Sequence, residues 1–135
     1  MELTVEIAAI RDGLGDSGRL VGEFRRAVLL VPLADGPEGG LMSAVSGGIR
    51  WIYAFTDEEA LARFAVARGE VESGREWEFL SVLGARLVDA VVPLADGPAG
   101  VVVNVADGDG SMFFPPVAGI VPDAHAVDVD RGEAA

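Results

Sequence analysis

Residues 47–64, with the sequence GGIRWIYAFTDEEALARF, constrain the fold more than any other part of the chain. Their hydrophobic pattern changes from a period of two residues to a helical period within a few positions. Trp51, Tyr53 and Phe55 alternate, so they share one face of a strand expected over residues 50–55. The other face of this strand is apolar too, which predicts that it is covered on both sides. The segment therefore predicts a β-strand that leads directly into an α-helix.

The start of that helix carries several capping signals. Thr56 stands at the expected N-cap and Glu59 follows three residues later, which gives a Thr-x-x-Glu capping box. The three consecutive acidic residues 57–59 place negative charge at the positive end of the helix dipole. Glu59 and Arg63 have the spacing of an i,i+4 ion pair, and Gly69 is the expected helix end. Capping thus accounts for the acidic cluster without a metal or acid/base site.

The rest of the pattern predicts one α+β domain, a mixed α/β arrangement with a mixed, mostly antiparallel sheet and flanking helices. Residues 3–11 also alternate like a strand, but the recurrence of apolar residues at three- and four-residue spacing favours a helix. The domain is expected over residues 1–121, followed by an acidic, flexible tail over residues 122–135. Further helices are expected over residues 20–26 and 83–91, and further strands over 28–33, 41–45, 76–80, 101–105 and 111–114.

Composition excludes several classes of function. The formal net charge is −12 and all ten basic residues are arginine. An acidic surface of this kind repels nucleic acids and anionic membranes, so neither is an expected partner. The chain has no cysteine, which excludes disulfides, thiolate catalysis and cysteine-based zinc sites. It shows neither a basic secretory start nor an apolar run long enough to span a bilayer, so we expect a soluble, cytoplasmic protein.

Four local motifs resemble functional sites. The sequence GLGDSG at residues 13–18 matches a dinucleotide-binding fingerprint, which would need a strand over residues 3–7. Its GDSG part resembles a serine-protease nucleophile loop, but the partner residues are missing. The DGDG sequence at 107–110 is typical of a hairpin turn rather than a calcium loop. His125, the sole histidine, lies in the expected tail. We therefore predict no catalytic residue, no metal and no cofactor.

The sequence VPLADGP occurs twice, at residues 31–37 and 92–98. The flanking patterns differ, which favours coincidence over an internal duplication. If the two loops converged, Asp35 and Asp96 would form a paired carboxylate site. The alternative function is accordingly a small-molecule-binding protein or an enzyme that uses these carboxylates.

Four segments taken in order resemble the SseB family, named for enhanced serine sensitivity, and in particular its N-terminal domain. They are AVLLVPL, RWIYAFTDEEAL, VVVNVADGDGSMFF and the closing PP. The resemblance covers about residues 20–121 and is strongest to the short, lysine-poor actinobacterial members. One departure is that the family often has Asn-Pro in the last hairpin, whereas Val105 follows Asn104 here.

The resemblance implies a bacterial protein with an α/β fold, a mixed sheet and flanking helices, and it implies no established activity. Because catalytic groups are scarce while the chain offers aromatic-bearing strands and a strongly acidic surface, we expect a non-catalytic protein-interaction or regulatory module, with a protein partner or a homo-oligomer. Trp77 and Phe79 are the candidate contact surface, because aromatic side chains on a strand can anchor partners. The competing interpretation is that both belong to the core.

Overall fold

The helices lie close to where the hydrophobic periods predict them. A computed structural model describes residues 2–34, 40–69 and 78–129. The helix expected over residues 3–11 is confirmed, and the second helix begins three residues earlier than predicted. The α-helices of the described ranges are α1 (Leu3–Arg11), α2 (Ser17–Arg26), α3 (Glu58–Ala67) and the short α4 (Gly84–Arg86).

The strands form two sheets, which confirms the predicted α+β class with mostly antiparallel pairing. One sheet has the order β2-β3-β5-β6 and the other pairs β1 with β4. Only β3 and β5 run parallel among the described strands, with Ile52 beside Val101. The strands are β1 (Val28–Pro32), β2 (Ser43–Ser46), β3 (Ile49–Ala54), β4 (Phe79–Leu83), β5 (Ala99–Val103) and β6 (Met112–Phe114).

Strand β1 connects the two sheets. The backbone groups of Leu30 and Phe55 exchange two hydrogen bonds of 2.8 Å, and Met42 N–H donates to the Pro32 carbonyl at 2.8 Å. One edge of β1 therefore lies along the end of β3 and the segment before β2. Its other edge pairs with β4, so β4 lies at the outside of this combined sheet.

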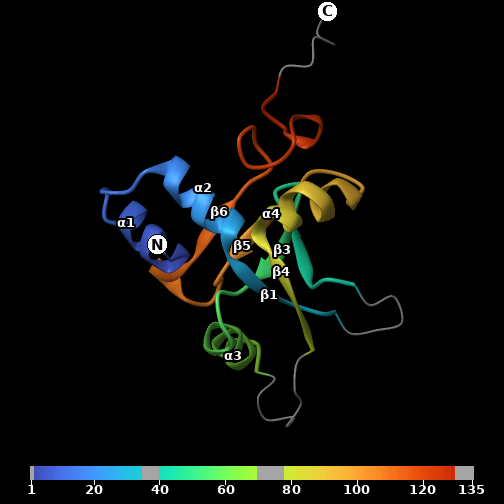
Figure 1. The fold of residues 1–135 in the computed structure, drawn as a ribbon. Helices are drawn as coiled ribbons and strands as arrows, with labels where there is room; N and C mark the ends of the chain where they lie inside the picture. Colours follow the sequence, from blue (N-terminus) through green and yellow to red (C-terminus); the bar gives the residue numbers. More distant parts are fainter. Residues whose placement is uncertain (1, 35–39, 70–77, 130–135) are drawn as a thin grey trace, which may run out of the picture.

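The larger sheet separates two layers of helices. Phe24 of α2 stacks on Phe114 of β6 with ring centroids 4.2 Å apart, on the face that also carries Ile52. Phe64 of α3 packs against Tyr53 on the opposite face, at 5.0 Å. In Figure 1, α1 and α2 lie together and α3 lies apart from them. The sheet is therefore covered on both faces at the Tyr53 end, as the two-sided apolar pattern predicts.

At the junction between β3 and α3, the helix cap lies one residue later than predicted. The N-cap of α3 is Asp57, whose Oδ1 accepts a hydrogen bond from Ala60 N–H at 2.8 Å. The prediction of Thr56 as N-cap was wrong by one residue, because the Thr56 side chain and N–H bond to Asn104 instead. Gly69 follows the C-cap with φ of 75°, as expected for a helix end.

Two repeated or suggestive motifs have ordinary structures. The Gly13–Gly18 motif begins in the turn after α1 and ends in the first turn of α2, and Asp16 caps α2 by accepting from Arg19 N–H at 2.9 Å. The strand that a dinucleotide fingerprint needs is thus replaced by a helix. The first VPLADGP copy begins in β1, whereas Val92–Leu94 of the second forms a 3-10 helix that continues the α4 segment. The described parts of the two copies therefore differ in structure.

The packed part of the chain continues beyond residue 121, where the tail was expected to begin. Asp123–His125 form a 3-10 helix, and Ala126 is 1% exposed within the main hydrophobic cluster. Val127 N–H donates to the Pro116 carbonyl at 2.8 Å. The core therefore includes residues that the sequence analysis assigned to the tail.

Candidate functional site

A polar groove lies beyond the carboxyl ends of the parallel strands β3 and β5. Thr56 follows β3 and Asn104 follows β5, and α3 begins two residues after Thr56, at Glu58. In open α/β sheets, ligands bind in the crevice outside the carboxyl ends of parallel strands. This place in the fold makes the groove the first candidate for a ligand site.

Asn104 holds the two strand ends together. Its Oδ1 accepts a hydrogen bond from Thr56 N–H and its Nδ2 donates to Thr56 Oγ1, both at 3.0 Å. Asn104 is 3% exposed and has a φ of 54°, in the left-handed region. Asparagine enters this region more easily than most residues, and such conformations are enriched at functional sites. The pair fixes the floor of the groove.

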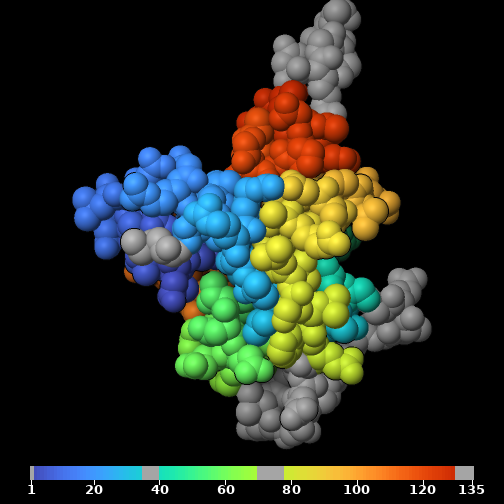
Figure 2. All heavy atoms as spheres, viewed as in Figure 1, coloured from blue at the N-terminus to red at the C-terminus, as the bar shows by residue number. Residues whose placement is uncertain are grey.

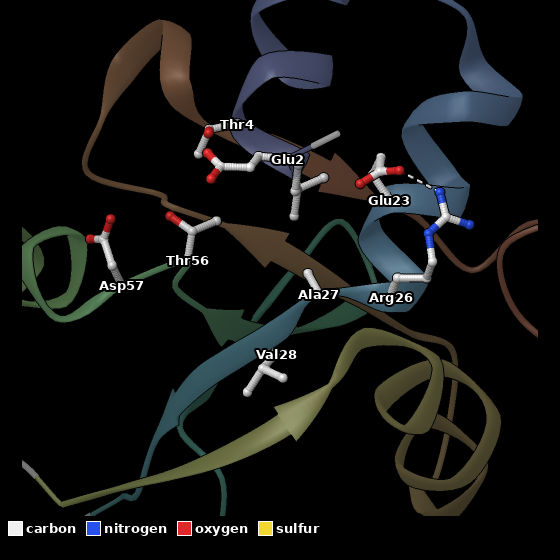
Figure 3. A pocket seen from close by; sticks show the side chains of 9 residues that line it. Glu2, Thr4, Glu23, Arg26, Ala27, Val28, Thr56 and Asp57 are labelled. Carbon is white, nitrogen blue, oxygen red and sulfur yellow. Dashed lines mark hydrogen bonds and ion pairs between the residues drawn. The ribbon is translucent and has the colours of Figure 1, made fainter.

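The groove consists of two adjoining hollows of about 370 Å³ and 540 Å³. Thr4, Thr56 and Asp57 line both of them. Figure 3 shows the smaller hollow, where the start of α1 lies opposite the β3–α3 junction and the Glu23–Arg26 pair of α2 lies at one side. The lining is open to solvent and mixed in charge, so the groove suits a small polar molecule better than an apolar one.

Two ion pairs, Arg63 with Asp107 and Arg26 with Glu23, engage charged side chains that line the groove. Arg63 binds Asp107 through two hydrogen bonds of 2.7 Å and 2.9 Å, rather than the predicted Glu59. The hydrogen bond from Arg63 holds the pKa of Asp107 below its usual value, and the same contact raises the pKa of Arg63. The bond from Arg26 likewise lowers the pKa of Glu23. Carboxyl groups whose pKa is lowered are poor proton donors at neutral pH.

Three candidate acid/base side chains are either engaged in a helix cap or lie outside the lining of the groove. Asp57 is engaged as a helix cap, and His125 lies outside the lining of both hollows. Glu6 is 4% exposed but does not line either hollow. Within residues 2–34, 40–69 and 78–129, no group of three or more His, Asp or Glu side chains is placed to hold a metal ion.

The structure leaves the paired carboxylates of the alternative function, Asp35 and Asp96, untested. Asp35 lies outside the described residues, so its distance to Asp96 stays untested. Asp96 is exposed and lines a separate hollow of about 450 Å³ that includes His125. Among the described residues, no hydrogen bond links Asp96 with His125.

The predicted contact residues lie at and before the start of β4. Trp77 lies outside the described residues. Phe79 is half-buried and packs against the cluster formed by Phe55, Leu61 and Phe64. In this structure Phe79 supports the layer between β1 and α3, as the competing core interpretation expects.

A second aromatic pair, which the sequence analysis did not select, lies on the larger sheet. Trp51 and Phe113 meet edge to face, with ring centroids 5.0 Å apart and an interplanar angle of 68°. The Trp51 ring lies over Gly100, where an added Cβ would come within 2.8 Å of the indole. Phe113 is 54% exposed. Helix α3 covers the Tyr53 end of this face, which leaves the Trp51 end more open.

Comparisons with known protein families, with curated proteins and with solved structures each find no match to this chain. The resemblance to the SseB family therefore stays a hypothesis drawn from the quoted motifs. Across the described part of the chain, no helix combines the length and the apolar character needed to cross a bilayer.

Proposed function

We propose that this chain is a non-catalytic protein-interaction module that binds a basic partner protein through Trp51 and Phe113. The observation that carries the proposal is this edge-to-face pair on the open part of the sheet. Aromatic residues dominate the binding energy of protein interfaces, because they bury a large area and lose little conformational entropy. A rigid sheet keeps both rings in place before binding, which lowers the entropy lost on association.

The charge of the chain supports a basic partner. The formal net charge is −12, so long-range electrostatics attract positively charged surfaces and repel acidic ones. The face of Trp51 and the face of Phe113 can also receive arginine or lysine side chains through cation–π contacts. Association should therefore weaken as salt screens this attraction.

Two carboxyl groups of the polar groove are engaged by arginine. These groups, those of Glu23 and Asp107, are both stabilised in the ionised form by that contact. A regulatory role requires binding alone. The proposal thus rests on the aromatic pair.

The test compares two surface variants in affinity capture from the lysate of the source organism. Phe113→Ser removes an exposed ring, and Val45→Ser changes a 60% exposed residue on the other face of the same sheet as the matched control. We expect one or more basic proteins that elute with salt, bind wild type and Val45→Ser alike, and bind Phe113→Ser at least about tenfold more weakly. Equal capture by Phe113→Ser, or capture that salt does not weaken, would contradict the proposal.

Fluorescence gives a direct check on the captured partner. The chain has two tryptophans, so Trp77→Phe leaves Trp51 as the single indole. Titration of this variant with the purified partner should change the Trp51 emission in a saturable way, because the ring loses water contacts on binding. An unchanged emission with binding shown by another method would place the interface elsewhere.

A second candidate function is binding of a small polar molecule in the groove beside Asn104. The observation that favours it is the left-handed, buried Asn104 at the carboxyl ends of the parallel strands. A panel of nucleotides and other polar metabolites should then raise the melting temperature of the wild type. Thr4→Arg, which places a long side chain from an exposed helix position into both hollows, should abolish that rise.

A further inference from the structure

The outer edge of β4 carries backbone groups that no other described strand pairs with. Leu33 N–H donates to the Glu78 carbonyl and Gly84 N–H donates to the Ala27 carbonyl, both at 2.9 Å. In the antiparallel register, the backbone groups of Leu80 and Val82 therefore face β1. Those of Phe79, Ser81 and Leu83 point to the other side, where no described strand pairs with β4.

This edge lacks the features by which proteins usually block strand pairing. Natural edge strands carry charges, proline or bulges that prevent association. The five residues of β4, FLSVL, contain none of them. Leu80 is 50% exposed and Leu83 is 47% exposed, and Val28, which pairs with Leu83, is 58% exposed. Figure 2 shows β4, in yellow, open along the near face of the molecule. An apolar edge of this kind is a template for an added strand.

We propose that the added strand is β4 of a second copy, so that two chains form a dimer through antiparallel β4–β4 pairing centred on Ser81. The outward position of the Ser81 backbone N–H and C=O allows the two Ser81 residues to form a hydrogen-bonded pair across a two-fold axis. Phe79 and Leu83 of one copy then lie beside Leu83 and Phe79 of the other. The two β1–β4 ribbons become one continuous four-stranded sheet.

The strand is self-complementary in this register. On one face, exposed Leu83 lies beside Phe79 of the second copy and extends the apolar row that begins at Val28. On the other face, exposed Leu80 lies beside Val82 of the second copy. Each cross-strand pair is apolar with apolar, which is the unit that stabilises sheets. FLSVL thus reads nearly the same in both directions around Ser81.

The charges at the ends of β4 favour a second copy over an unrelated strand. Glu78 is exposed before the strand, and Arg86 is exposed two residues beyond Gly84. The two-fold register places Glu78 opposite Gly84 of the second copy. The acidic Glu78 of one copy and the basic Arg86 of the other therefore lie at the same end of the strand pair. The net charge of −12 on each copy works against association at long range. Dimerisation should therefore strengthen with added salt, opposite to binding of a basic protein.

The test measures self-association of the full chain by sedimentation at increasing concentration and at two salt concentrations. We expect a monomer–dimer equilibrium that salt shifts towards dimer. Ser81→Lys places two ammonium groups opposite each other and should weaken the dimer by at least about tenfold. Ser46→Lys, at an exposed position on β2, is the matched control and should leave the dimer unchanged. A chain that stays monomeric in high salt, or a dimer unaffected by Ser81→Lys, overturns the proposal.

A cross-linking experiment fixes the register. The chain has no cysteine, so Ser81→Cys introduces a single thiol at the predicted two-fold axis. Mild oxidation should produce a covalent dimer from Ser81→Cys and not from Ser46→Cys. Equal cross-linking of both variants would indicate random collision and contradict the register. Ser81→Lys should still capture basic proteins as the wild type does, because the aromatic pair is intact in this variant. The dimer and the aromatic interface can therefore be tested separately.

Discussion

Asn104 is the one residue other than glycine with a positive φ in the described part of the chain. Its side chain bonds to a residue 48 positions earlier, at the end of the neighbouring parallel strand. In the sequence, Asn104 differs from the family pattern only in that Val105, not proline, follows it. Local patterns show which residues tolerate the left-handed region, but they do not show which distant backbone group such a residue meets. This is why the floor of the groove was not predicted.

Two substitutions of Asn104 distinguish the stability cost of backbone strain from the cost of the lost hydrogen bond. Asn104→Ala should reduce the free energy of unfolding by about 2–4 kcal/mol, because the variant forces alanine into the left-handed region and leaves Thr56 N–H without its partner. Asn104→Gly should lose about 1 kcal/mol less, since glycine adopts this φ freely. Urea unfolding of both variants measures the difference. Equal losses would show that the φ of Asn104 contributes no strain.

The same contact explains the misplaced helix cap. Thr56 and Asp57 are both good N-cap residues, but only Thr56 is followed three residues later by a glutamate, whereas Ala60 has that place after Asp57. The capping box favoured Thr56 on local grounds. In the folded chain, Asn104 engages Thr56 and leaves Asp57 to cap α3. A tertiary hydrogen bond thus decides between two locally acceptable helix starts.

At the scale of elements, Gly84 sets how closely α4 approaches α2. A Cβ at this position would lie 1.9 Å from the Phe24 carbonyl oxygen. Gly84→Ala should therefore lower the free energy of unfolding by about 3 kcal/mol, because the two helices must separate or shift. Gly97→Ala, where an added Cβ meets nothing within 4 Å, is the control and should change stability little. Thermal unfolding of the two variants should differ clearly.

The Arg63–Asp107 pair links α3 to the β5–β6 connection and gives stability a pH dependence. Because Arg63 lowers the pKa of folded Asp107, the contribution is present above the unfolded value of about 3.9 and is lost as pH falls through the folded value. Asp107→Asn should therefore unfold at lower urea than wild type at pH 7, and this difference should shrink below about pH 4. Asp109→Asn, an exposed change in the same loop, is the control. A constant difference at all pH values would contradict the assignment.

The hydrophobic periods predicted where helices and strands lie along the chain better than they predicted which strands and side chains lie next to one another. The aromatic strand, the helix after it and the closing hairpin all follow from residues adjacent in sequence. The parallel pairing of β3 with β5, and the position of Phe113 beside Trp51, depend on contacts between distant segments. Local alternation, which points to Trp77 and Phe79, cannot distinguish a core face from an open one; the structure shows this only for Phe79, because Trp77 lies outside the described residues. The open aromatic pair became visible only when the strand order was known.

At the scale of the molecule, the acidic composition destabilises the compact state, whereas the packed C-terminal segment stabilises it. A net charge of −12 gives the compact state a self-repulsion. Composition also made residues after 121 resemble a solvated tail, since small and acidic residues dominate there. Ala126 nevertheless completes the main core, and the Asp128 carboxylate accepts from Ala118 N–H at 2.8 Å. A few apolar contacts thus outweigh an average composition that suggests disorder.

Two truncations test where the domain ends. A chain that stops after Val121 loses Ala126 from the core, together with the hydrogen bonds of Val127 and Asp128. It should lose about 2–4 kcal/mol of unfolding free energy, because an apolar contact and two backbone partners disappear. A chain that stops after Val129 keeps every described contact and should match the full chain. Urea unfolding followed by near-ultraviolet circular dichroism measures both. Equal stability of the two truncated chains would place the end of the folded unit at residue 121 after all, and would show that Ala126 is buried without contributing to the core.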